Sequence, residues 1–145
     1  LGVLKYRFEH RLVYSVRIDQ GMYKLIIPRM TLQPFVENSL KHGLSGVDKP
    51  IKININGKIT DQGWEIIIKD NGKGIEQKNI EKIYNAINNY NKENTEIDSM
   101  KKNEVEGLGI LNTYMRLKIF FGDKLYFKIN SSLQKGTEII IRVKN

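Results

Sequence analysis

An alternation of isoleucine with polar residues constrains this chain more than any other feature of its sequence. In IKININGKIT (residues 51–60), Ile51, Ile53 and Ile55 fall on one face of an extended segment, which favours a half-buried strand. The β-rich run WEIIIK (64–69) follows after turn residues at 61–63, so the two runs predict a β-hairpin. Residues 125–131 and 137–143 repeat this pattern around a turn at 134–136. Each hairpin then needs a cover for its apolar face.

Apolar residues at helical spacing supply that cover in three places. The first predicted helix runs from an N-cap at Thr31 to about residue 43, the second covers residues 80–87, and the third runs from 107–109 to about 121. An alternating segment at 10–18 predicts another strand, followed by a turn at 19–21, and the polar stretch 88–106 is interpreted as a lid or loop. This order predicts an α/β two-layer sandwich, with a mixed five-stranded sheet and three helices on one face.

The composition fits one soluble domain and excludes several classes of chemistry. The 145 residues contain no cysteine, which excludes disulfides, thiol nucleophiles and cysteine-based zinc sites. Two histidines, His10 and His42, lie far apart in sequence and leave little for a metal cluster, and no apolar run approaches the ~20 residues of a membrane span. The net charge of +8 comes from scattered lysines, which favours a solvated surface or an anionic small ligand. A basic nucleic-acid-binding module is the alternative outside the enzymes.

Four polar residues of the first predicted helix lie off its apolar stripe. They are Glu37, Asn38, Lys41 and His42. An amide oxygen beside an ammonium group is what a magnesium-phosphate ligand needs, because one binds the cation and the other the phosphate. A solvated helix face with a Glu37–Lys41 ion pair explains the same residues.

Two glycine-rich segments follow at element boundaries. Asp70-Asn-Gly72-Lys-Gly74 comes directly after a predicted strand, where the glycines let backbone approach a flat ligand and Asp70 can accept a hydrogen bond from an exocyclic amine. The sequence GLG at 107–109 opens a helix whose free N–H groups can bind an anion. An ordinary turn and an ordinary helix start are the alternatives. Neither segment has the Rossmann or Walker A pattern.

The order of these motifs resembles that of the Bergerat-fold ATPases, which include gyrase, chaperone, histidine kinase and mismatch-repair ATPases. The most similar group is the ATP-binding catalytic domain of sensor histidine kinases of the YesM type. LQPFVENSLKHG (32–43) is similar to the N box of that group and DNGKGI (70–75) to its G1 box. GLGILNTYMRLKIFFG (107–122) is similar to the G2 box, and KGTEIIIRV (135–143) to the terminal G-T strand.

The resemblance implies a role for each matching residue. Asn38 is implied to coordinate Mg²⁺ bound to the triphosphate of ATP, and Glu37 and Lys41 are the other catalytic candidates. Asp70 is implied to accept a hydrogen bond from the exocyclic amine of adenine. The other implied nucleotide-binding residues are Lys41 and His42 toward phosphates or ribose, Gly72, Gly74 and Ile75 around the base, Gly107, Leu108 and Gly109 toward the phosphates, and Thr137 beside adenine.

Departures from the superfamily pattern bear on the reaction. Hydrolytic members carry a glutamate one turn before the asparagine, and here that position is Pro34, which favours phosphoryl transfer over water attack. No clear F box follows residue 75, which leaves the contacts of the lid open. The alternatives within the fold are a serine kinase of the anti-sigma type and a degenerate nucleotide-binding regulator.

The acceptor of the phosphoryl group is expected outside these residues. In the YesM type the acceptor histidine lies in a Pro-His-Phe context upstream, and the chain has no such motif. Leu1, Leu4 and Phe8 at helical spacing predict that residues 1–9 end the dimerisation helix ahead of an ATP-binding domain at 10–145. The resemblance implies a dimeric, membrane-anchored kinase with this domain in the cytoplasm, a downstream response regulator, and no nucleic-acid partner.

Overall fold

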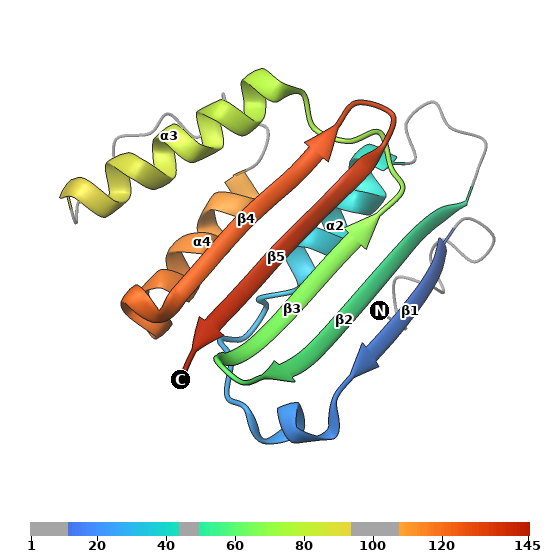
Figure 1. The fold of residues 1–145 in the computed structure, drawn as a ribbon. Helices are drawn as coiled ribbons and strands as arrows, with labels where there is room; N and C mark the ends of the chain where they lie inside the picture. Colours follow the sequence, from blue (N-terminus) through green and yellow to red (C-terminus); the bar gives the residue numbers. More distant parts are fainter. Residues whose placement is uncertain (1–11, 44–49, 94–107) are drawn as a thin grey trace.

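Helices cover one face of a five-stranded sheet in this computed structural model, which describes residues 12–43, 50–93 and 108–145 (Figure 1). The predicted two-layer α/β architecture is confirmed. The elements in chain order are β1 (Leu12–Ile18), the short 3₁₀ helix η1 (Gln20–Lys24), α2 (Gln33–Gly43), β2 (Ile51–Thr60), β3 (Gly63–Asp70), α3 (Gln77–Glu93), α4 (Leu108–Phe121), the 3₁₀ turn η2 (Gly122–Lys124), β4 (Leu125–Ser132) and β5 (Gly136–Lys144). None of the helices in the described part is both long and apolar enough to span a membrane.

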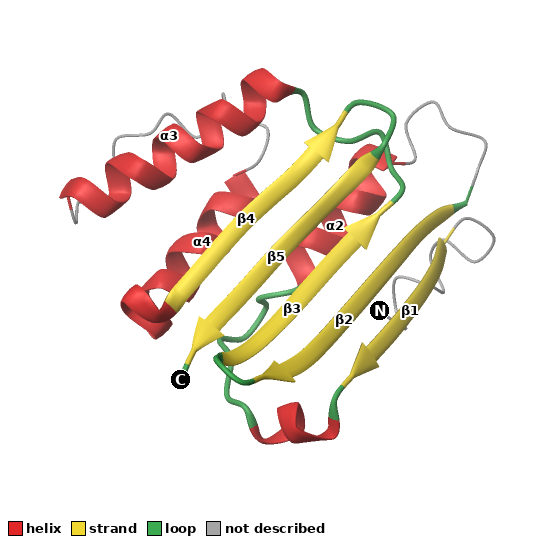
Figure 2. Cartoon of the chain, viewed as in Figure 1, coloured by secondary structure: helices red, strands yellow, loops and turns green. Residues whose placement is uncertain are grey.

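The sheet is mixed, as the sequence predicts. Its strand order is β1-β2-β3-β5-β4, with β1 parallel to β2 and every other neighbour antiparallel. Both predicted hairpins are present as β2–β3 and β4–β5, and α2 lies on the connection between the two parallel strands (Figure 2). Because β3 and β5 are adjacent, the end of β3 lies beside the start of β5, although 65 residues separate Asp70 from Gly136.

Alternate residues of the strands form the core under the helices. Ile55, Ile68 and Ile139 lie in register across β2, β3 and β5, and all three are buried. The Phe127 ring of β4 packs between helices, with its centroid 6.3 Å from that of Phe35 and 5.4 Å from that of Tyr114. The alternation in the sequence therefore matches the structure, in which every second side chain of a strand points into the core.

Two local predictions are wrong, and one predicted turn extends further than expected. Thr31 is not an N-cap, because its hydroxyl donates to the Pro28 carbonyl at 2.7 Å and α2 begins at Gln33. The turn expected at 19–21 is present, since the Met22 N–H donates to the Asp19 carbonyl at 3.0 Å, and it continues as η1 to Lys24. The predicted loop at 88–106 is helical as far as residue 93, since the Tyr114 hydroxyl donates to the Asn91 side chain at 2.9 Å and holds α3 against α4. The rest of that predicted lid lies outside the described residues.

The other face of the sheet carries a buried carboxylate. Glu65 of β3 is hydrogen-bonded by Arg142 of β5 and lies 3.1 Å from the Lys58 ammonium of β2. Burial alone would raise the pKa of Glu65, but the hydrogen bonds and charges of Arg142 and Lys58 outweigh it and hold that pKa below its ordinary value of 4.5. The Arg142 guanidinium also lies 5.2 Å from the centre of the Tyr126 ring.

Glu65→Gln is expected to lower the free energy of unfolding at neutral pH by about 1–2 kcal/mol, because two cations lose a charged partner. A folded-state pKa below the unfolded one stabilises the protein above pH 4.5, and this stabilisation is lost as the pH falls through the folded-state value. Urea unfolding from neutral pH downward should therefore show the difference between wild type and the variant shrinking below pH 4.5. Asp61→Asn in the exposed β2–β3 turn is the matched control. A difference that stays constant with pH would exclude Glu65 as the titrating group.

Candidate functional site

A cavity of about 90 Å³ opens where β3 ends and β5 begins, under α2 and α4. Six of the residues predicted to bind nucleotide line it: Asn38, Asp70, Gly72, Gly74, Ile75 and Thr137. Apolar walls come from the helices and strands, namely Phe35, Ile68, Ile110, Leu133 and Ile139. Residues from four separate parts of the sequence thus meet at one place, and an apolar cavity with a few convergent polar groups is the usual form of a small-molecule site.

Asp70 is the most firmly positioned polar group of this cavity. Its Oδ1 accepts hydrogen bonds from the backbone N–H of Gly72 at 2.7 Å and of Thr137 at 3.3 Å. Its Oδ2 lies 2.8 Å from the Ser39 hydroxyl of α2, which shares its single proton between this oxygen and the Phe35 carbonyl oxygen at 2.9 Å. A carboxylate has about four acceptor positions, so these three bonds orient Asp70 and leave one position on Oδ2 for a ligand.

The loop after β3 is clamped by the β4–β5 hairpin. The N–H of Gln134 donates to the Lys73 carbonyl at 2.7 Å, and the N–H of Ile75 donates to the Ser131 hydroxyl at 2.8 Å. Gly136 has a φ of +82°, and a Cβ there would lie 2.0 Å from the Asp70 carbonyl oxygen. Backbone therefore packs on backbone at this point, which only glycine permits.

Asn38 enters the cavity from α2 and lies beside the start of α4. A Cβ placed on Gly109 would be 3.6 Å from its Nδ2 and 3.8 Å from its Oδ1. The half-buried Asn38 amide has no hydrogen-bond partner among the residues whose side chains the structure describes, 12–40, 50–91 and 109–145. Glu37 is placed differently, because it is exposed, does not line the cavity, and accepts a hydrogen bond from Gln33 at 2.7 Å.

Four predicted site residues are described only in part or not at all. Lys41 and His42 belong to α2 and Leu108 opens α4, but their side chains lie outside the described part of the chain. Gly107 lies outside the described residues altogether. The implied phosphate contacts of these residues therefore stay predictions.

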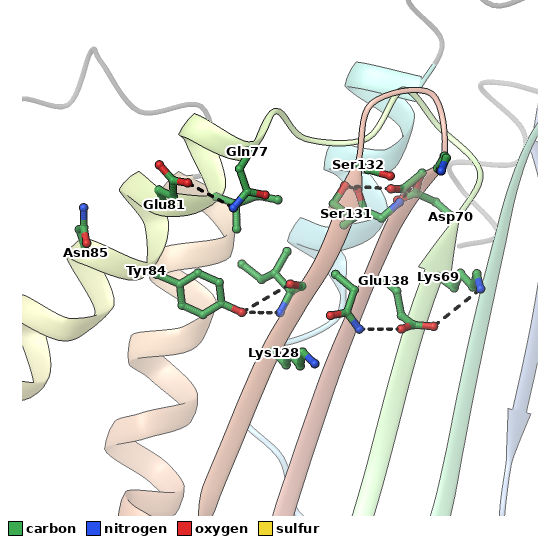
Figure 3. Close-up of a pocket in the computed structure, with 16 residues that line it drawn as sticks. Lys69, Asp70, Gln77, Glu81, Tyr84, Asn85, Lys128, Ser131, Ser132 and Glu138 are labelled. Carbon is green, nitrogen blue, oxygen red and sulfur yellow. Dashed lines mark hydrogen bonds and ion pairs between the residues drawn. The ribbon is translucent and has the colours of Figure 1, made fainter.

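A larger hollow of about 920 Å³ lies between α3 and the β4–β5 hairpin (Figure 3). Its wall is mostly polar, with Glu138 hydrogen-bonded by Asn130 at 2.9 Å and 3.7 Å from the Lys69 ammonium. The Tyr84 hydroxyl accepts a hydrogen bond from the Ile129 N–H at 2.9 Å and so covers the free edge of β4. The smaller cavity is the better site for a base, because Asn38 and the apolar walls border only that one.

Sequence reasoning missed three polar residues that line the cavity, Ser39, Lys73 and Glu76, and one beside it, Ser131. Ser39 follows Asn38 directly and interrupts the apolar stripe of α2, a signal that could have identified it. Ser131 at the end of β4 carries no such signal. Glu76 lines the cavity mouth, and its 2.7 Å contact with the Lys78 ammonium lowers the Glu76 pKa, so this carboxylate stays charged.

Comparison with known proteins identifies the class of this fold and site. The family model of histidine kinase-, DNA gyrase B- and HSP90-like ATPases matches residues 25–145. The chain therefore belongs to this family, and the resemblance noted from its motifs is confirmed.

The similar sequences are sensor kinases. Sensor histidine kinase YesM of Bacillus subtilis is 28% identical over 143 residues, 99% of this chain and 21% of that protein. Sensor histidine kinase YpdA of Escherichia coli is 27% identical over 145 residues, 100% of this chain and 22% of that protein. The chain thus spans about a fifth of the length of these relatives.

Solved structures share the fold. The histidine kinase domain of the blue-light activated histidine kinase of Erythrobacter litoralis superposes with a TM-score of 0.62 at 12% identity, covering 99% of this chain and 56% of that one. The catalytic domain of histidine kinase ThkA gives a TM-score of 0.57 at 14% identity, covering 98% and 85%. At these identities the comparison supports the architecture alone.

Gly136→Ala is expected to destabilise the chain more than Gly122→Ala, although both glycines have positive φ. A Cβ on Gly122 meets nothing within 4 Å, so its cost is the conformational one of about 1–2 kcal/mol. A Cβ on Gly136 must in addition displace the Asp70 backbone. Urea unfolding compares the stabilities, and a nucleotide-binding titration should show weakened binding for Gly136→Ala alone. Equal losses of stability would contradict the close backbone approach.

Proposed function

We propose that this chain binds ATP with Mg²⁺ and transfers the γ-phosphoryl group to a histidine outside these 145 residues. The observation that carries the proposal is the Asp70 carboxylate, fixed by three hydrogen bonds at an apolar cavity, with a free acceptor position. The names of the similar sequences favour a histidine kinase over the serine-kinase, degenerate and nucleic-acid-binding alternatives.

The cavity residues fit adenine. A ring system suits the apolar walls, and the exocyclic amine of adenine is a donor where Asp70 is an acceptor. Guanine has a carbonyl oxygen at that position and would leave two acceptors facing each other. An unsatisfied buried acceptor costs about 1–3 kcal/mol or more, so Asp70 selects adenine over guanine.

Asn38 is the proposed ligand for the cation. Its amide oxygen is a suitable donor for Mg²⁺, and it has no competing partner among the described residues. When bound with ATP, Mg²⁺ supplies charge neutralisation to the phosphates. The N–H groups at the start of α4, around 107–109, are proposed to hold phosphate oxygens, together with Lys41 and His42 of α2.

The protein's contribution to the transfer is to position the nucleotide. Pro34 stands where hydrolytic relatives carry a water-activating glutamate, so water is proposed to be a poor nucleophile here. Glu37 is adjacent to Asn38, and its carboxylate is exposed at the outer side of α2. We assign Glu37 to the side from which an external histidine approaches.

The whole protein is proposed to be a dimeric, membrane-anchored sensor kinase with this domain in the cytoplasm. The support is the similarity to sensor kinases about five times longer than this chain. Residues 1–9 are proposed to end the helix that carries the acceptor module, and a response regulator is the proposed downstream partner.

Asp70→Asn is expected to weaken ATP binding at least tenfold, because the amide presents a donor where the carboxylate offers an acceptor. Calorimetric titration of the wild type should give much tighter binding of ATP and ADP than of GTP. Asp61→Asn, which removes the same charge far from the cavity, should bind ATP like the wild type. Equal wild-type affinities for ATP and GTP would contradict the role of Asp70.

Phosphoryl transfer should require a second polypeptide. With γ-labelled ATP the 145-residue chain alone should hydrolyse little and acquire no label, and adding the upstream dimerisation helices should label that partner. The label should be acid-labile, as phosphohistidine is, and the rate low, because a partner in trans lacks the effective concentration of a tether. Acid-stable label on serine or threonine of the chain alone would favour the serine kinase.

Asn38 is tested in the same assay. Asn38→Ala should abolish labelling of the partner while nucleotide binding without metal stays largely intact, because Asp70 recognises the base independently. Asn56→Ala on the exposed face of β2 is the matched control and should transfer phosphate normally. Normal phosphoryl transfer by Asn38→Ala would contradict the metal-ligand role and favour the alternative, in which Asn38 is only part of a solvated helix face.

A further inference from the structure

The Ser131 hydroxyl at the end of β4 makes three contacts that determine where its proton lies. The Ile75 N–H approaches Oγ at 2.8 Å, the Gly136 carbonyl oxygen lies at 2.8 Å, and the Thr137 Oγ1 lies at 2.9 Å. The first of these groups can only donate and the second can only accept. Only the Ser131–Thr137 contact has two possible directions.

One arrangement of protons makes all three contacts hydrogen bonds. Ser131 has one proton, and the Gly136 carbonyl requires it, because otherwise two acceptor oxygens would face each other at 2.8 Å. The Ser131 oxygen then accepts from the Ile75 N–H and, in its remaining position, from the Thr137 hydroxyl. The Thr137 proton is therefore directed toward Ser131, and Thr137 can offer a ligand only lone pairs.

We propose that Ser131 is a specificity-determining residue, which acts by fixing Thr137 as a second hydrogen-bond acceptor beside Asp70. The two residues are neighbours, because the Thr137 backbone N–H donates to Asp70 Oδ1 at 3.3 Å and both residues line the cavity. The inference rests on the proposed nucleotide function and deepens it. The site is complementary to an amine with two hydrogens, because each acceptor can take one of them. A 6-oxo purine is disfavoured, because its carbonyl oxygen would face two acceptors and no donor.

The test compares ATP with inosine triphosphate, which carries an oxygen in place of the amine. In Ser131→Ala the Thr137 proton loses its acceptor and can turn toward a ligand oxygen. The ratio of ATP to inosine triphosphate affinity, measured by calorimetry on the 145-residue chain, should fall about threefold to tenfold, the value of one hydrogen bond. Ser15→Ala, which removes another strand hydroxyl on the exposed sheet face, should leave the ratio unchanged.

The ratio of ATP to inosine triphosphate affinity distinguishes a role of Ser131 in nucleotide specificity from a purely structural role in holding the loop after β3. Loss of the Ser131–Ile75 hydrogen bond alone would weaken both nucleotides equally and leave the ratio at its wild-type value, which would overturn the proposal. If Ser131→Ala does not fold, Thr137→Val gives the second measurement. Removing the acceptor should weaken ATP about threefold to tenfold but leave purine riboside triphosphate, which has no amine, unaffected.

Thr137→Ser keeps the hydroxyl and should restore the preference for ATP that Thr137→Val loses. Equal weakening of ATP and purine riboside triphosphate by Thr137→Val would also overturn the proposal. These outcomes are distinct from failure of the proposed function, in which the wild-type chain would bind none of the three nucleotides.

Discussion

The site depends on the contact between the loop after β3 and the β4–β5 hairpin. Gly136 lies directly against the Asp70 carbonyl, and Gln134 and Ser131 hold the loop through hydrogen bonds at 2.7 and 2.8 Å. Because β3 and β5 are hydrogen-bonded neighbours, this contact is an extension of the sheet itself. The position of the Asp70 carboxylate is thus set by strand pairing, which is much more rigid than a free loop.

Hydrogen bonding is what makes a carboxylate tolerable beside an apolar cavity. Asp70 has two backbone donors and the Ser39 hydroxyl, which compensate its charge, and no cation of the described side chains pairs with it. The charge of Glu65 on the opposite face of the sheet is compensated differently, by the cationic side chains of Arg142 and Lys58. The first arrangement leaves an acceptor available to a ligand, whereas the second is closed by its own partners. This contrast supports the proposed role of Asp70 in ligand recognition and a structural role for Glu65.

Part of the site could be predicted from sequence. Helical spacing puts Asn38 off the apolar stripe of α2 but leaves a solvated helix face as the alternative, and a glycine-rich loop directly after a strand points to Asp70 and Gly72; the order of these motifs, through its resemblance to a known family, joins them into one site. Ser131 could not be predicted, since nothing in its neighbourhood distinguishes it from a solvent-facing strand serine. Its role exists only because Ile75 and Thr137, which come from two other segments, meet at its oxygen.

The sequence by itself determined the elements. The period of two in IKININGKIT and the helical spacing around Phe35 are properties of neighbouring residues, and both hairpins follow from local turn chemistry. Tertiary structure decided what local patterns cannot encode: the order β1-β2-β3-β5-β4, the continuation of polar α3 to residue 93 through its contact with Tyr114, and the use of Thr31 by Pro28 in place of a helix cap. The physical reason is that each of these depends on partners distant in sequence or on competition for one hydroxyl, and such contacts form only when the chain is packed.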